Sequence, residues 1–170
     1  MFTIPSPMLS YWSEHPEPKA ARSDVSMIES TLGWTLPPSY VEFVTTYGFV
    51  VFGRDIEGRC RFDYRRQLPD RTELYEGNVR FLHDAASVLE AYENLTEAED
   101  PDDESLPSFP KQYLPVGNDA GQGQVLLDMG SESGGVWYWP ERDWAWGRED
   151  NTWLGFVAKD FYEFISLLRP

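Results

Sequence analysis

The chain has 170 residues, of which 29 are acidic and 14 are lysine or arginine, giving a formal net charge of -15 at pH 7. Hydrophobic residues make up 41%, too many for a disordered chain, and the length predicts one domain with a substantial core. The sign of the charge argues against nucleic acid and anionic membranes as partners, because phosphate surfaces need lysine or arginine opposite them.

The first 22 residues contain four prolines and predict an irregular N-terminal arm. We expect Met8, Leu9, Tyr11 and Trp12 to hold this arm against the body, and residues 23–170 to form the single domain. The arm shows no basic stretch followed by an apolar one, and no segment approaches the length of a membrane-spanning helix. The sequence therefore predicts a soluble cytoplasmic protein.

Two short helices are predicted next. Ser23 can cap the first, which ends at Gly33 and carries apolar residues at three- and four-residue spacing: Val25, Ile28 and Leu32. The second follows Pro37-Pro38, ends at Gly48 and has the apolar stripe Tyr40, Phe43, Val44 and Tyr47.

The middle of the chain mixes strands with one helix. Residues 49–52 and 79–83 predict strands, since they are rich in β-branched and aromatic side chains. A further strand is expected near 58–65, and the rest of 54–78 is expected to be loop. Asp84 then caps a helix whose buried stripe is Val88, Leu89, Tyr92 and Leu95.

The C-terminal part predicts a hairpin and a closing helix. Residues 117–123 have turn chemistry, and the strands 124–129 and 136–139 are joined through Gly134-Gly135. Residues 153–157 form a weaker strand, and the last helix buries Phe161, Phe164, Ile165 and Leu168. This order predicts an α+β fold rather than a parallel α/β sheet.

Side chains for catalysis are scarce. A nucleophile needs a neighbouring base, and the two histidines are His15 in the arm and His83 at a strand end. His83 could serve as such a base, but no nucleophile-elbow motif accompanies it, so a structural role is favoured. Cys60 has no second thiol for a disulfide or a metal pair, and is predicted to be an ordinary strand thiol.

Two segments invite ligand hypotheses that their details oppose. The glycines of 117–123 are not followed by the Lys-Ser/Thr of a phosphate-binding loop, and Asp119 would repel phosphate. Six of the eight residues 97–104 are acids, but they lack the glycine and closing glutamate of a calcium loop. We predict neither a metal nor a cofactor, and we expect 97–104 to be a solvated, mobile loop.

The tryptophans divide into two pairs. Trp137 and Trp139 alternate with Tyr138, so both fall on one strand face and are expected to enter the core. Trp144 and Trp146 lie among charged residues, which fits either aromatic anchors in a polar interface rim or simple packing. A sugar-binding or enzymatic use of the tryptophans with His83 is a further hypothesis.

The acidic excess points to a partner. Solubility alone is the simpler explanation, but the net charge of -15 is well beyond what solubility requires. We therefore predict a partner-binding surface that steers a basic protein toward the chain. Its predicted residues are Asp100, Asp102, Asp103, Glu104, Asp119, Trp144 and Trp146.

Four segments together resemble the SUKH superfamily, which includes cell-wall regulators and many bacterial immunity proteins. Residues 28–48 are similar to the family's E-x-x-L-G-x-x-L-P-x-x-Y-x-x-F signature, and 113–119 with the following glycine turn are similar to its P-I-G-x-D-G-x-G segment. Residues 136–139 and 161–164 correspond to its next strand and its terminal helix.

This resemblance implies a curved antiparallel sheet with helices packed against it, and no enzymatic activity. It also implies an antidote that neutralises a cognate toxin, often a nuclease of a polymorphic or contact-dependent system. A scaffold or regulatory module that binds a housekeeping protein is the alternative. The sequence leaves the oligomeric state open.

Overall fold

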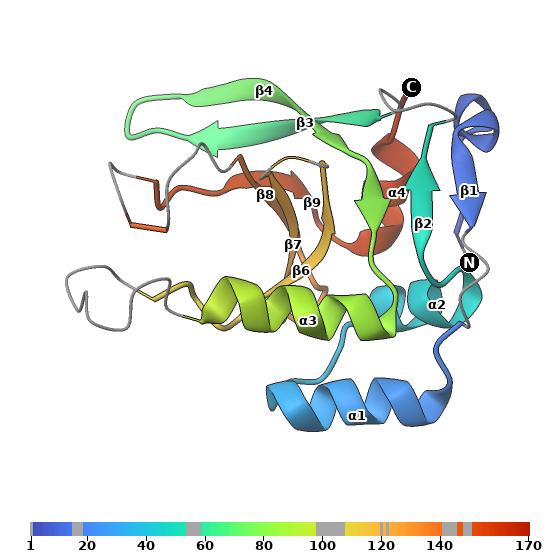
Figure 1. Cartoon of the computed structure of the whole chain (residues 1–170). Coiled ribbons are helices and arrows are strands. Elements are labelled where there is room, and N and C mark those ends of the chain that lie inside the picture. The colour runs from blue at the N-terminus through green and yellow to red at the C-terminus, as the bar shows by residue number, and fades with distance from the viewer. Residues whose placement is uncertain are drawn as a thin grey trace.

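The protein has an α+β fold built on an open, strongly curved antiparallel sheet, as the sequence predicted (Figure 1). The computed structural model describes residues 2–14, 19–53, 59–97, 108–119, 121, 123–140, 146–147 and 151–170. Its helices are η1, a 3-10 helix (Ser6–Ser10), α1 (Arg22–Leu32), α2 (Pro38–Thr46), α3 (Ala85–Thr96) and α4 (Phe161–Leu167). Its strands are β1 (Trp12–Glu14), β2 (Val50–Phe52), β3 (Cys60–Gln67), β4 (Thr72–Val79), β5 (Phe81–Leu82), β6 (Tyr113–Asn118), β7 (Gln124–Asp128), β8 (Val136–Trp139) and β9 (Gly155–Ala158).

The sheet owes its curvature to one short connection. The strand order is β1-β2-β5-β6-β7-β8-β9-β3-β4, so β1 and β4 are its edges. Arg80 alone separates β4 from β5, although the two strands are far apart in that order. The backbone of Arg80 donates to Asn118 at 2.8 Å and accepts from Phe52 at 2.8 Å. The sheet must therefore bend until the end of β4 reaches β5.

The helix boundaries follow local capping. Gly33 ends α1 with φ 71°, and Asp84 and Asp160 begin α3 and α4 by accepting a backbone N–H bond at 2.8 Å. The roles of Gly33 and Asp84 were predicted correctly. The predicted Ser23 cap was wrong, because α1 begins at Arg22 and the carboxylate of Asp24 accepts the Ala21 N–H at 2.7 Å.

Three further predictions were wrong. Residues 72–78 were expected to be loop, yet with Val79 they form edge strand β4, paired with β3 along its whole length. The irregular arm contains η1 and β1, and Leu9 is exposed rather than packed on the body. Gly117 and Asn118, assigned to a turn, belong to β6, since both pair with β7.

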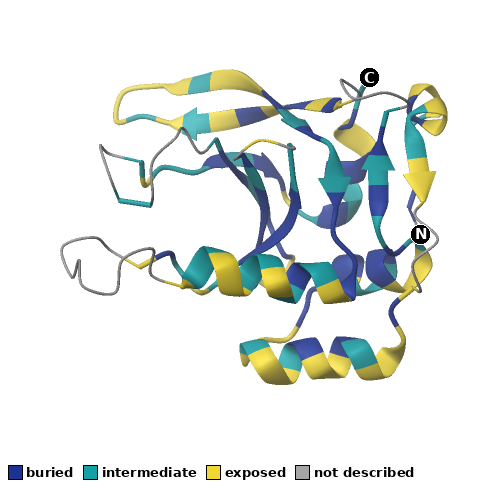
Figure 2. Ribbon diagram, viewed as in Figure 1, coloured by how far each residue is buried: buried dark blue, intermediate teal, exposed yellow. Residues whose placement is uncertain are grey.

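The core is divided between the two faces of the sheet. The larger apolar cluster draws on all four α-helices and includes Val125, Leu127 and Tyr138. Leu126 and Trp139 alternate with those residues along β7 and β8, so they point to the other face, where Phe109 completes a second cluster. Trp137 packs against it, so the predicted shared face is confirmed. Buried residues fill the centre of the sheet, and exposed ones predominate on α1 and at the β3–β4 tip (Figure 2).

Candidate functional site

The predicted partner-binding residues are only partly described. Two of them, Asp119 and Trp146, have described positions. The other five lie outside the described residues: Asp100, Asp102, Asp103, Glu104 and Trp144. Partner contact stays a prediction for all seven.

Asp119 braces the loop between β6 and β7. Its Oδ1 accepts the backbone N–H of Gly121 at 2.8 Å and of Gly123 at 3.1 Å. Its Oδ2 accepts the hydroxyl of buried Tyr138 at 3.2 Å, and this burial, followed by the nearby carboxylate, raises the pKa of Tyr138. A Cβ at Gly123 would lie 2.7 Å from the Asp119 Oδ2, so the glycine keeps this arrangement compact. The carboxylate is therefore occupied by hydrogen bonds from its own loop and from β8.

Trp146 is half-buried in the second apolar cluster. Its ring meets Phe109 edge-on at 4.8 Å between centroids, and Trp139 edge-on at 5.4 Å. The sequence left two interpretations of Trp146 open, an interface anchor and simple packing. The contacts that this indole makes are those of packing.

His83 is a buried residue rather than an exposed base. Its backbone donates to Val116 at 3.0 Å, and its ring lies 6.2 Å from that of Phe49. Neither ring nitrogen has a hydrogen-bond partner among the described residues. Burial lowers the pKa of His83 to about 4, against the opposing effect of Asp84. At neutral pH the imidazole is uncharged, and no described hydroxyl or thiol is hydrogen-bonded to it as a nucleophile would be.

Other reactive groups are equally enclosed. Cys60 is buried in β3 with its Sγ 3.7 Å from the Met8 Sδ, and burial raises the pKa of its thiol to about 12. Among the described residues, no three His, Cys, Asp or Glu side chains are grouped to hold a metal ion. In the same part of the chain, no helix is long and apolar enough to cross a membrane.

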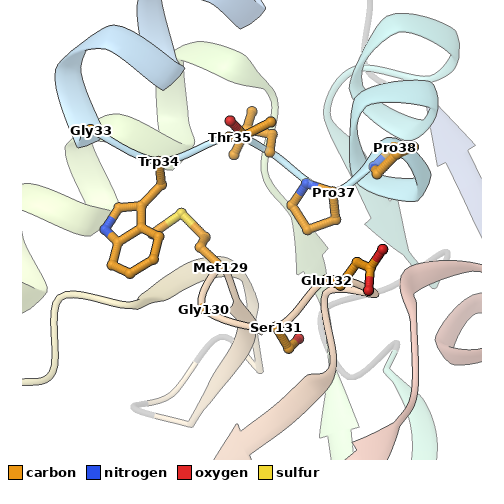
Figure 3. Close-up of a pocket in the computed structure, with 10 residues that line it drawn as sticks. Gly33, Trp34, Thr35, Pro37, Pro38, Met129, Gly130, Ser131 and Glu132 are labelled. Atoms are coloured by element: carbon orange, nitrogen blue, oxygen red, sulfur yellow. The ribbon is translucent and has the colours of Figure 1, made fainter.

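A groove opens between the α1–α2 connection and the turn that joins β7 to β8 (Figure 3). Its volume is about 510 Å³. Residues 33–38 form one wall and residues 129–132 form the other. The sequence reasoning did not identify this site, because its walls are about 100 positions apart in the chain and meet only in the folded sheet.

The first wall is a fixed corner. Gly33 donates its N–H to the Glu29 carbonyl at 2.9 Å, which closes the last turn of α1. The Glu29 carboxylate then accepts the Leu36 N–H at 2.9 Å. Leu36 is only 2% exposed, so its side chain anchors the corner in the core. Trp34 projects from this anchored segment.

The second wall is a turn with internal hydrogen bonds. Asp128 accepts the Gly130 N–H on its Oδ1 at 2.9 Å and the Ser131 hydroxyl on its carbonyl at 3.1 Å. The same hydroxyl accepts the Gly135 N–H at 3.0 Å. These bonds leave little freedom to the segment that carries Glu132.

Gly134 brings the two walls together. It has φ 70°, and a Cβ at this position would lie 2.5 Å from the Cβ of Pro37. Only glycine allows this approach, because any side chain would meet the proline ring and the backbone is left-handed. The width of the groove therefore depends on this contact.

Two side chains of the groove lack an aromatic or charged partner among the described residues. Trp34 is 37% exposed and belongs to neither apolar cluster of the described residues. In Figure 3 the side chain of Met129 reaches toward its indole. Glu132 is exposed, and no residue in the described ranges forms an ion pair or hydrogen bond with its carboxylate. An aromatic face and a free carboxylate thus border one cavity.

These features define a small α+β domain with a surface groove, in which His83 and Cys60 are buried. The chain matches the family model described as SMI1 / KNR4 family (SUKH-1) over residues 19–167, and it therefore belongs to this family. The resemblance predicted from the four sequence segments is confirmed. No curated protein matches the chain.

The family signature coincides with the first wall of the groove. Of the matched residues, Gly33 ends α1, Leu36 is buried, and Pro37 faces Gly134. Trp34 occupies a position that the signature leaves variable. In this chain the signature residues therefore build the corner of the groove, and Trp34 projects from between them.

Proposed function

We propose that the protein is an immunity protein that binds a basic toxin, of the nuclease kind used in polymorphic or contact-dependent systems, and neutralises it without catalysis. The observation that carries this proposal is the net charge of -15 on a member of the SMI1/KNR4 family. Such a family is consistent with an antidote that acts by binding.

The charge supports the choice of a basic partner. A nuclease binds its substrate through a cleft lined by lysine and arginine, because each phosphate contact requires a cation. An acidic protein can occupy the same cleft, and opposite charges raise the association rate and disfavour wrong partners. The segment 97–104, with six acids in eight residues, adds to this steering field.

A capture experiment tests the proposal. The purified chain is immobilised, exposed to lysate of its own source, and washed at low and then high salt. We expect one basic protein to be released by the high-salt wash, because screening shortens the range of exposed charges to about 3 Å at 1 M salt. The released protein should be toxic when expressed alone and harmless when expressed with this chain.

The alternative, a scaffold that binds a housekeeping protein, gives a different result. Its partner would be neutral or insensitive to salt, and co-expression would protect against no toxin. Either result would remove the antidote proposal and make the acidic charge a feature of solubility.

A further inference from the structure

We infer that the groove between the α1–α2 corner and the β7–β8 turn receives an arginine side chain of the partner, held between Trp34 and Glu132. This inference rests on the proposed function, since it names how a basic protein partner is recognised. It assigns the contact to residues outside the predicted steering acids.

The shape of the groove suits a long amphipathic side chain. A volume of about 510 Å³ is larger than one side chain needs, so an arginine can enter with part of an apolar neighbour. Its walls combine polar surface with the apolar side chains of Trp34, Pro37 and Met129, which can cover the aliphatic stem. The exposed indole offers a face on which a guanidinium can stack.

The charge of the groove selects a cation. Glu132 is the one ionisable side chain among the residues that line it, and no described lysine, arginine or histidine joins them. An arginine that stacks on Trp34 can place its guanidinium toward this carboxylate, because Figure 3 shows the two side chains on opposite sides of one groove. An acidic or phosphorylated segment would meet the same carboxylate and be repelled.

Rigidity makes the site effective. The Glu29 carboxylate holds the corner at Leu36, and Asp128 and Ser131 hold the turn. Binding therefore orders little backbone, and less of the interaction free energy is lost to entropy. A partly exposed tryptophan on a fixed corner is the kind of residue that dominates interfaces.

The first arm of the experiment needs no natural partner. The isotopically labelled protein is titrated with the blocked peptide Ala-Leu-Arg-Leu-Ala, and with the same peptide carrying neutral citrulline in place of arginine. We expect saturable shifts of the Trp34 indole N–H and of the Gly130 and Glu132 amides, with a dissociation constant of about 1 mM. Citrulline should weaken binding about fivefold. Equal binding of both peptides, or shifts elsewhere on the surface, would overturn the inference.

The second arm uses the partner released in the capture experiment. Trp34→Ala should weaken its binding about tenfold and Glu132→Gln about threefold. Leu74→Ala and Asp70→Asn are matched controls, since Leu74 is 65% exposed and both lie in the distant β3–β4 hairpin. They should change affinity less than twofold.

The two proposals can fail separately. If a basic toxin is captured but the Trp34 and Glu132 variants bind it like the controls, the groove inference is wrong and the antidote proposal stands. If no basic partner is captured, the antidote proposal is lost, while the peptide titration still decides whether the groove takes a guanidinium. Thermal unfolding of each variant confirms that binding is measured on folded protein.

Discussion

The β3–β4 hairpin and the groove beside α1 both place aromatic rings next to charged groups, but they use them differently. In the hairpin the guanidinium of Arg66 lies 4.0 Å from the ring centroid of Trp153, and Tyr64 stacks on Tyr75 at 5.6 Å. Arg71 forms an ion pair with Glu73 at 2.7 Å. Each aromatic and each of these charges has a partner within the chain.

In the groove the same residue types lack such partners among the described residues. Trp34 has no ring contact and Glu132 has no cation among the described residues, although both are held by fixed backbone. Beside the hairpin, Arg66 supplies the cation that lies over Trp153. The comparison teaches that the groove lacks the cation that the hairpin supplies internally, and a basic partner could provide it.

The largest effect is expected where the groove is assembled. Gly134→Ala places a Cβ 2.5 Å from the Cβ of Pro37 at a position with φ 70°. Left-handed strain and overpacking together should lower the free energy of unfolding by about 2–4 kcal/mol, measured by urea denaturation. The walls should also separate, so the arginine peptide should bind more weakly.

Gly33→Ala is the matched control for that change. Gly33 has φ 71°, but a Cβ there meets nothing within 4 Å. Backbone strain alone should cost about 1 kcal/mol and leave the groove intact. Equal losses for the two variants would mean that the contact with Pro37 does not set the distance between the walls.

A second, smaller effect on stability is expected when a hydrogen-bonded carboxylate is compared with one that has no described partner. Asp119→Ala removes the acceptor for two backbone N–H groups and for the Tyr138 hydroxyl, and should destabilise the protein by about 1–2 kcal/mol. Glu132→Ala should change stability by less than about 0.5 kcal/mol, since its carboxylate has no described partner. Both variants lose one negative charge. A difference between their stabilities, measured by calorimetry, therefore reflects the hydrogen bonds of the carboxylate rather than its charge. The reverse order of stabilities would contradict our assignment.

Elements whose signal is local were predictable from the sequence. Asp84 and Asp160 bond to backbone three residues away, and Gly33 closes its own helix, so each pattern needs no distant contact. The β7–β8 hairpin followed in the same way from its alternating apolar residues and glycine turn. The family segments were also recognisable, because their glycines meet steric demands such as that of Gly123 against Asp119.

Elements defined by distant contacts were missed. Strand β4 has an exposed, mixed sequence because only Gly77 and Val79 reach the core, so its alternation is weak. Strand β1 owes its existence to pairing with β2. The groove was hidden for the same reason, since Trp34 and Glu132 become neighbours only after Gly134 meets Pro37.

The smallest effect on stability is expected in the β3–β4 hairpin, whose aromatic and charged side chains have partners within the chain. Arg66→Ala removes the cation above Trp153 and should lower the free energy of unfolding by about 0.5–1 kcal/mol. Arg65→Ala is the matched control, because it removes the same charge from the next residue, which alternation directs to the other face of β3. We expect the control to change stability by less than about 0.5 kcal/mol.

Partner affinity decides what the hairpin result means. If its aromatic rings are satisfied internally, Arg66→Ala and Arg65→Ala should change binding of the captured partner equally, through net charge alone. The change should also shrink as salt is added, because exposed charges are screened. A specific gain or loss for Arg66→Ala at high salt would show that Trp153 also contacts the partner, and the contrast between the closed hairpin and the open groove would no longer hold.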